Sequence, residues 1–98
     1  MTAPRIRPSM VVMDLLEVLA SASEDSLAWG LSLCEGTGYG TGTVYPALNR
    51  LLNAGLITGR WEDPAPADRP RRRYYKISAA GRNWLGEQAR RRESRRRG

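Results

Sequence analysis

The sequence predicts a mainly α fold with a small β-hairpin, in the order helix, helix, helix, strand, strand, helix. Three observations support this order. Apolar residues recur at helical spacing in three separate segments, two alternating runs flank a proline-rich stretch, and a serine precedes a last apolar segment. A helix-turn-helix followed by a two-stranded wing has this arrangement, so we expect a winged helix-turn-helix.

Size and charge suggest one small domain with a polyanionic partner. The chain has 98 residues, and 41% of them are hydrophobic, which is enough for one core. Its 16 basic and 10 acidic side chains give a net charge of +6, as expected for a nucleic-acid-binding protein. We divide the chain into a flexible basic arm (1–8), the winged-helix domain (9–89) and an arginine-rich tail (90–98) that frays unless an anion orders it.

Several classes of protein are excluded. Cys34 is the only cysteine and there is no histidine, so the sequence supports no disulfide framework, zinc cluster or histidine-based catalytic triad. We therefore expect no enzyme, no metal and no cofactor. The most apolar stretch, residues 10–19, contains two carboxylates and is too short to span a membrane, and the first residues do not form a secretory leader. We expect a cytoplasmic protein.

The first helix should follow Ser9, which can cap it. Its main apolar face consists of Val12, Leu15, Leu16 and Leu19. Val11 and Val18 add a second apolar face, which either packs within the same domain or contacts a second chain.

The second helix is expected from Leu27 through Leu31 and Cys34, ending at residues 35–36. Residues 36–42 contain four glycines and should form the turn. Because no strand precedes them and no Gly-Lys-Ser follows, they do not form a phosphate-binding loop.

The third helix is the best-defined element. Its apolar face consists of Val44, Leu48, Leu51 and Leu52. We expect a threonine between residues 41 and 43 as its N-cap and Gly55 as its left-handed stop.

The wing and the last helix complete the domain. Residues 57–61 and 73–77 alternate as strands, and the proline-rich residues 63–70 form the exposed hairpin tip. Ser78 can cap a helix that extends through Trp84 and Leu85 to Ala89. We expect all three tryptophans, Trp29, Trp61 and Trp84, to be core residues rather than to line a dimer cavity.

The outer side of the third helix is polar and free of acids, which suits a DNA major groove. Thr43, Asn49 and Arg50 are the candidate base readers, because Asn pairs with adenine and Arg with guanine. Tyr45 and Pro46 lie on the same helix, and the Tyr45 hydroxyl can reach a phosphate. The other interpretation is an ordinary solvated helix face.

Basic residues also cluster at the hairpin. They are Arg69, Arg71, Arg72, Arg73 and Lys76, and we expect them to bind phosphates without reading sequence. The alternative is a charged hairpin that only keeps the protein soluble.

Two blocks of sequence resemble the PadR family of transcriptional regulators. The first is GTVYPAL (42–48), followed by RL (50–51) and GLI (55–57), and the second is RRYYKISAAG (72–81), preceded by WE (61–62). The blocks occur in the family's order with a wing-sized gap between them. The similarity extends from about residue 10 to residue 85.

The resemblance implies a homodimeric repressor that binds double-stranded DNA at a palindromic operator. It places Tyr45 and Pro46 on the recognition helix and Arg72, Arg73 and Tyr74 on the wing strand. The terminal helices would form the dimer contact, and its candidate residues here are Val11, Leu15, Val18, Trp84 and Leu85.

This chain departs from the family's usual pattern in three places. Residues 27–31 read LAWGL where the family commonly has YGYEL, and the glycine often found before the RRYY block is absent. Members that bind drugs or phenolic acids have a longer last helix, whereas Trp84 lies early in this one, which argues against a pocket for a small-molecule effector. The alternative functions are a winged-helix adapter for other proteins and a non-specific nucleic-acid-binding protein.

Overall fold

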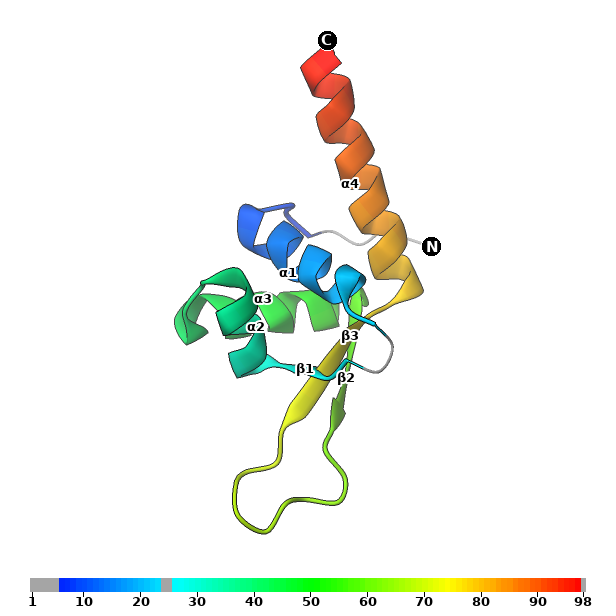
Figure 1. The fold of residues 1–98 in the computed structure, drawn as a ribbon. Helices are drawn as coiled ribbons and strands as arrows, with labels where there is room; N and C mark the ends of the chain where they lie inside the picture. The colour runs from blue at the N-terminus through cyan, green and yellow to red at the C-terminus, as the bar shows by residue number, and fades with distance from the viewer. Residues whose placement is uncertain (1–5, 24–25, 98) are drawn as a thin grey trace.

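The computed structural model describes residues 6–23 and 26–97, and it confirms the predicted fold class (Figure 1). The elements are α1 (Met10–Ser21), β1 (Ala28–Trp29), α2 (Gly30–Thr37), α3 (Thr41–Asn53), β2 (Ile57–Trp61), β3 (Arg73–Ile77) and α4 (Ala79–Arg97). The sheet is antiparallel with the order β1-β3-β2, and β2 and β3 form the wing. Helix α1 packs against α2, α3, α4 and β3, so it is the central element of the domain.

Strand β1 was not predicted, because the sequence analysis starts the second helix at Leu27. Residues Ala28 and Trp29 instead pair with Tyr75 and Tyr74 of β3. Helix α2 then begins at Gly30, where the Ser32 hydroxyl accepts a hydrogen bond from Trp29 N and donates one to Trp29 O, both at 2.8 Å. A strand of two residues is too short to show a period of apolar residues, so the spacing did not distinguish a strand from the start of a helix here.

The core consists mainly of the apolar positions that the helical spacing identifies in α1 and α3. The prediction for the second helix is wrong, because Leu27 and Leu31 are 46% and 56% exposed, and Leu33 is the buried residue there. The side chains with at most 1% exposure include Val12, Leu15, Leu16, Leu33, Val44, Leu48, Leu51 and Leu56. Tyr75 of the sheet and Trp84 of α4 close this cluster. The glycine-rich turn is fastened to it by the Tyr39 hydroxyl, which donates a 2.6 Å hydrogen bond to Asp14 Oδ2 of α1. This hydrogen bond raises the pKa of Tyr39.

The predicted ends of α3 are partly confirmed. The N-cap is Gly40, so the expectation of a threonine cap is wrong, and Thr41 is already the first helical residue. Val44 N donates to Gly40 O at 3.0 Å, which closes the first turn one residue earlier than a Thr41 cap would. At the other end, Gly55 has a φ of 74°, the left-handed conformation predicted for it.

Helix α4 begins as predicted and is longer than predicted. The Ser78 hydroxyl accepts a 3.0 Å hydrogen bond from Gly81 N and donates a 2.7 Å bond to Gly55 O at the end of α3. The helix then continues to Arg97, so the expectation of a frayed tail beyond Ala89 is wrong for the described residues. Arg, Glu and Gln are good helix formers and no glycine or proline interrupts residues 87–97, so the helix has no stop signal there.

Candidate nucleic-acid interface

The outer face of α3 is exposed to solvent. Val44, Ala47, Leu48 and Leu51 point into the core and are at most 1% exposed, which leaves the other side of the helix outward. The exposed residues include all five that the sequence analysis selects on this helix: Thr43, Tyr45, Pro46, Asn49 and Arg50. No carboxylate occurs anywhere in α3, so nothing on this face repels a phosphate.

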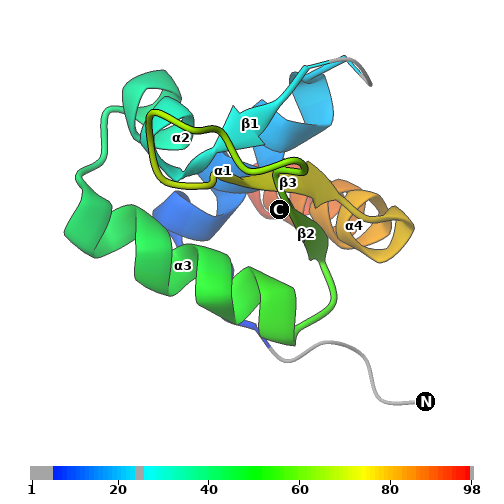
Figure 2. The same cartoon turned by 90° about the horizontal axis from the view of Figure 1, so that it is seen from below.

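A groove separates this helix from the wing. Its volume is about 550 Å³, and we call it the wing groove. Its lining combines the first turn of α2, the Tyr45 side of α3 and the base of the wing: Trp29, Gly30, Leu31, Tyr45, Trp61, Arg69, Pro70, Arg71, Arg72, Arg73 and Tyr75. Figure 2 shows α3 and the wing loop on the side of the molecule opposite the C-terminal end of α4. The structure therefore brings Tyr45 and four of the five predicted wing cations to one concave surface.

Tyr45 lies directly over the start of α2. A methyl group added to Gly30 would lie 2.5 Å from Tyr45 Cε1 and closer still to the hydroxyl, so only glycine leaves room for the ring. Gly30 itself is buried, whereas Tyr45 is 41% exposed. The ring therefore has a fixed support and an outer side open to a ligand.

The wing is held together by Glu62. Its carboxylate accepts two hydrogen bonds from the Arg69 guanidinium, at 2.7 and 2.9 Å, and one from the Tyr74 hydroxyl at 2.8 Å. It also accepts a 3.4 Å hydrogen bond from Arg72 N. The bonds from Arg69, together with those from Tyr74 and Arg72 N, lower the pKa of Glu62 from 4.5 to about 2 against an opposing contribution from burial. Arg69 and Tyr74 thus hold the wing internally, and the charge of Arg69 is balanced there.

Two other wing arginines lie against aromatic rings. The Arg72 guanidinium carbon is 4.1 Å from the centre of the Trp29 ring, and that of Arg73 is 5.7 Å from the centre of Trp61. Contacts of this kind attract the cation and fix its side chain. Arg73 Nε is the buried side-chain nitrogen without a hydrogen-bond partner among the described residues. Both cations are half-buried, and Arg71 beside them is exposed.

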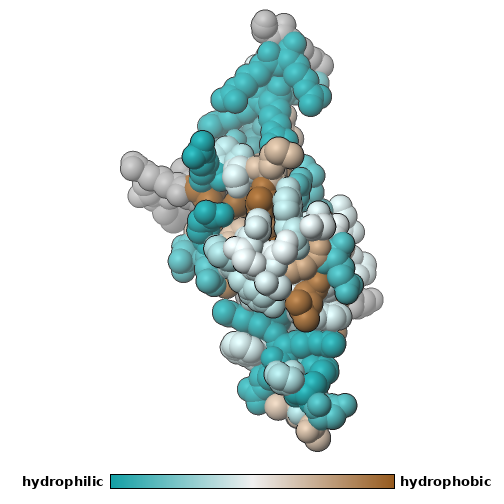
Figure 3. Space-filling view, turned by 90° about the vertical axis from the view of Figure 1, so that its left-hand side faces the viewer, coloured by the Kyte–Doolittle hydropathy of each residue, from teal (hydrophilic) through white to brown (hydrophobic). Residues whose placement is uncertain are grey.

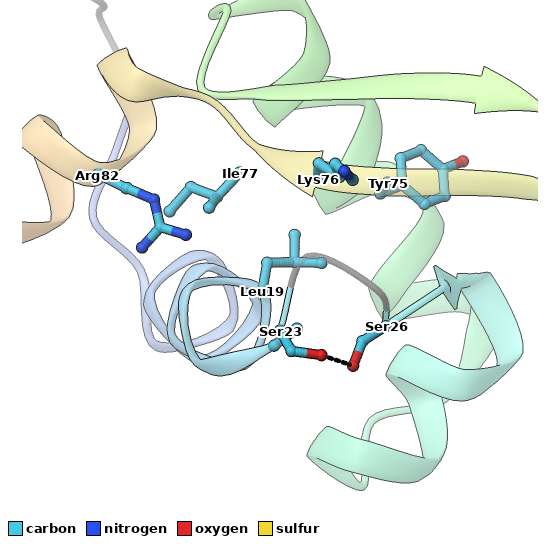
Figure 4. Close-up of a pocket in the computed structure, with 8 residues that line it drawn as sticks. Leu19, Ser23, Ser26, Tyr75, Lys76, Ile77 and Arg82 are labelled. Carbon is cyan, nitrogen blue, oxygen red and sulfur yellow. Dashed lines mark hydrogen bonds between the residues drawn. The ribbon is translucent and has the colours of Figure 1, made fainter.

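Lys76 is not part of the wing groove. It alternates with Tyr75 along β3, so it lies on the other face of the sheet. It also contributes to a small pocket of about 120 Å³ that Ser23, Tyr75, Ile77 and Arg82 line as well (Figure 4). Of the predicted wing cations, Lys76 is the one that the structure separates from Tyr45.

The candidate dimer residues differ in their exposure. Leu15 is fully buried and Trp84 is 7% exposed, and both belong to the core of their own chain, so Leu15 has no surface to offer a partner. Val11, Val18 and Leu85 are half-buried. The second face of α1 is partly covered within the chain, since Val18 lies close to Gly36 of α2. The exposed apolar residue at the start of α1 is Met10, at 71%.

The tryptophan prediction is correct for Trp84 and wrong for Trp61, which is 57% exposed at the end of β2. Trp29 is half-buried beside the wing groove. The sequence analysis also missed Leu31 and Glu62 as residues of this region. An apolar residue at the end of a strand, next to a basic loop, was the available signal for Trp61.

Comparison with known proteins decides the family. Residues 31–87 match the transcriptional regulator PadR-like family, and this span covers more than half of the chain. The chain belongs to the PadR-like family of transcriptional regulators. No curated protein sequence matches this PadR-like regulator.

Solved structures agree with this PadR-like fold. A PadR-like transcription factor from Bacteroides fragilis is 24% identical with a TM-score of 0.75, over 90% of this chain and 84% of that one. A PadR family regulator from Clostridium difficile is 18% identical with a TM-score of 0.72, over 91% and 93% of the two chains. Bacillus subtilis PadR, solved in complex with operator DNA, is 16% identical with a TM-score of 0.68, over 83% of this chain and 48% of that one.

In the described ranges, no three His, Cys, Asp or Glu side chains lie close enough together to hold a metal ion. No helix among the same residues is long and apolar enough to cross a membrane.

Proposed function

We propose that this PadR-like regulator binds double-stranded DNA with α3 in the major groove and the wing on the adjacent backbone. One observation carries the proposal: the carboxylate-free face of α3 is exposed, and Tyr45 on that helix lines the same groove as the wing arginines. A recognition helix reads bases, and a cationic wing neutralises phosphates beside it.

The residues divide into two roles. Asn49 and Arg50 read base edges, because their side chains can make paired hydrogen bonds with adenine and guanine, and Thr43 contacts bases near the start of the helix. Tyr45 and the arginines 71, 72 and 73 bind phosphates. The aromatic contacts of Arg72 and Arg73 hold these cations before DNA arrives, which reduces the entropy lost on binding.

We further propose a homodimer that binds a palindromic operator in the cytoplasm and represses transcription. Two-fold symmetry in the protein requires two half-sites about one helical turn apart. The partly exposed apolar residues Val11 and Leu85, with Met10 beside them, support a contact through the terminal helices. Repression itself is supported by the family resemblance.

Selection of bound duplexes from a random pool at moderate salt tests the proposal. We expect a sequence motif with two related halves, and a footprint that covers both. Asn49→Ala and Arg50→Ala should each cost about 1–3 kcal/mol for the selected site and relax the preference at one position per half.

A matched control is Arg60→Ala. Arg60 is exposed on β2 but pairs with Tyr74, so it lies on the sheet face away from the wing groove. The substitution Arg60→Ala removes one positive charge, as Arg50→Ala does, and it should leave the sequence preference unchanged. A pool without any enriched motif would point to non-specific binding. Regulatory activity that survives the combined variant Arg72→Ala and Arg73→Ala would instead favour the adapter function.

A further inference from the structure

The second half of α4 projects from the body of the domain. Every residue from 89 to 96 is exposed, and the helix runs away from the sheet and from the wing (Figure 1). An open cleft, lined in part by Glu17 and Arg92, lies between this half and α1. The body of the domain therefore does not cover residues 90–96, which we call the arginine segment.

The arginine segment has no apolar side. Five of its seven residues are arginines, at positions 90, 91, 92, 95 and 96, and the other two are Glu93 and Ser94. At about 100° per residue these arginines lie all around the helix rather than in one stripe. A partner helix or a second copy would need an apolar seam, and the segment has none.

Charge within the segment is not balanced by the chain. Glu17 of α1, Glu87 and Glu93 are the carboxylates nearby, against five guanidinium groups. The ion pair between Arg91 and Glu87 has a length of 4.0 Å and both side chains are more than half exposed, so it contributes little. The segment therefore presents a net positive charge to an outside partner.

The arginine segment and the wing lie at opposite ends of the molecule. The longest dimension of the protein is 55 Å. In Figure 3 hydrophilic surface covers the α4 end and the wing end, and paler and more apolar surface lies between them. A straight duplex that lies along α3 and the wing does not reach the arginine segment.

We infer that the arginine segment binds the phosphate backbone of a second segment of double-stranded DNA, so that the protein bridges two duplexes. This inference rests on the proposed function, in which α3 and the wing hold the first duplex. Guanidinium groups pair with phosphates in a two-pronged geometry. Cations around the whole helix fit a groove with a phosphate backbone on each side, whereas a flat acidic protein surface would contact only one side.

The dimensions and composition agree with this partner. An α-helix with its side chains is about 10–12 Å across, which matches the major-groove width of about 12 Å, and the segment is about 10 Å long. It contains no Asn or Gln to pair with adenine, and its arginines point to several sides of the helix, so they do not form one base-reading face. We therefore expect the second contact to be independent of sequence and strongly weakened by salt.

A two-duplex capture assay tests the inference with the full chain. The selected operator duplex is fixed to beads, the protein is bound to it, and a fluorescent duplex of scrambled sequence is then added. We expect the wild-type protein to capture the second duplex. A variant with glutamine at positions 90, 92, 95 and 96 should stay on the beads and capture at least about tenfold less, because it loses four phosphate contacts.

Controls separate charge from structure. Glutamine is a good helix former, so the helical content measured by circular dichroism should not change. Lysine at the same four positions keeps the charge and should retain most of the capture. Capture by the glutamine variant at the wild-type level would overturn the inference.

Other outcomes have equally definite meanings. If the glutamine variant leaves the operator beads, the segment belongs to the first DNA contact, and bridging is wrong. If it becomes monomeric while the wild type is dimeric, the arginines bind a partner chain, and bridging is again wrong. If the wild type does not hold any operator, the proposed function fails instead, and capture of scrambled duplex by bead-bound protein still tests the segment on its own.

Discussion

At the scale of single residues, the wing depends on one carboxylate. Glu62 follows β2 and accepts hydrogen bonds from Arg69, Tyr74 and the Arg72 backbone, which lie on the β3 side of the hairpin. The sequence predicted Arg69 and Tyr74 as DNA contacts from their type and place. It could not predict their pairing, because Asp63 and Asp68 are both nearer than Glu62 to Arg69 in the chain and only the register of the hairpin selects Glu62.

Glu62→Gln should loosen the wing without unfolding the domain. Glutamine offers one carbonyl oxygen in place of two charged oxygens, so it cannot accept both Arg69 hydrogen bonds. We expect faster amide hydrogen exchange at Glu62 and Arg72, and unchanged exchange in the α1 core. Asp63→Asn is the matched control, since Asp63 is exposed next to it in the same loop. Equal exchange in both variants would contradict the role of Glu62.

The pH dependence follows from the lowered pKa of Glu62. Because its pKa is about 2 in the folded protein and 4.5 ordinarily, the carboxylate stabilises the folded wing fully above about pH 4.5. This contribution decreases as the pH falls from about 4.5 to about 2, and it is absent below. The Arg72 amide resonance should therefore stay constant from pH 8 to 5 and shift only in the acid range. A shift centred near pH 6 would show that another group controls the wing.

Gly30 should determine whether Tyr45 can be used for binding. In Gly30→Ala the new methyl group displaces the Tyr45 ring, and the phosphate contact proposed for its hydroxyl is lost. A hydrogen bond to a charged group contributes about 1.5 kcal/mol or more, so operator affinity should fall at least about tenfold. Gly36→Ala is the control in the same helix, because its methyl group would meet only Val18, at an ordinary distance of 3.8 Å. Fluorescence anisotropy with the selected duplex measures both.

At the scale of elements, helices α1 and α3, both wing strands and the start of α4 were predictable. Their apolar spacing is regular, and Ser9, Gly55 and Ser78 mark ends with local chemistry. Strand β1 was not predictable, because two residues have no period and their pairing with β3 spans more than forty positions. The burial of each tryptophan was not predictable either, because it depends on which other element covers that side chain.

Alanine substitutions of Trp84 and Trp61 should lower the free energy of unfolding by different amounts. Trp84 is 7% exposed in the core, so Trp84→Ala should lower the free energy of unfolding by about 3–5 kcal/mol. Trp61 is 57% exposed, so Trp61→Ala should change stability by no more than about 0.5 kcal/mol. Urea unfolding followed by circular dichroism gives both values. Similar losses for the two variants would mean that the exposed ring of Trp61 is covered in solution.

At the scale of the whole molecule, the groove between α3 and the wing follows from how three elements meet. The sequence identified the cations and the polar helix face separately. Their common groove also requires Gly30, Leu31 and Trp29, which the analysis assigned to a continuous second helix. The dimer surface was also not predictable from the sequence alone. Leu15 fits the helical pattern for a partner contact, but it is buried in the core of its own chain.

Association through the terminal helices should link stability to concentration. If the folded protein dimerises, its thermal midpoint rises with protein concentration. Met10→Glu should weaken this rise, because it places a charge on the exposed start of α1 while remaining favourable for the helix itself. Leu31→Glu, at another exposed apolar position that lines the wing groove, should leave the rise intact. A wild-type midpoint that does not change with concentration would rule out the dimer.

Ser78 occupies the one point where the recognition helix and the projecting helix meet. Its hydroxyl touches Gly55, which ends α3, and Gly81, which lies in the first turn of α4. Leu56 O accepts a further 3.0 Å bond from Ser78 N, and no side chain larger than hydrogen fits at Gly81 beside this carbonyl. The angle between the two helices is thus set at a rigid joint. Tension on α4 from a bound partner would therefore reach the end of the helix that reads DNA through the Ser78 hydrogen bonds to Gly55 and Leu56.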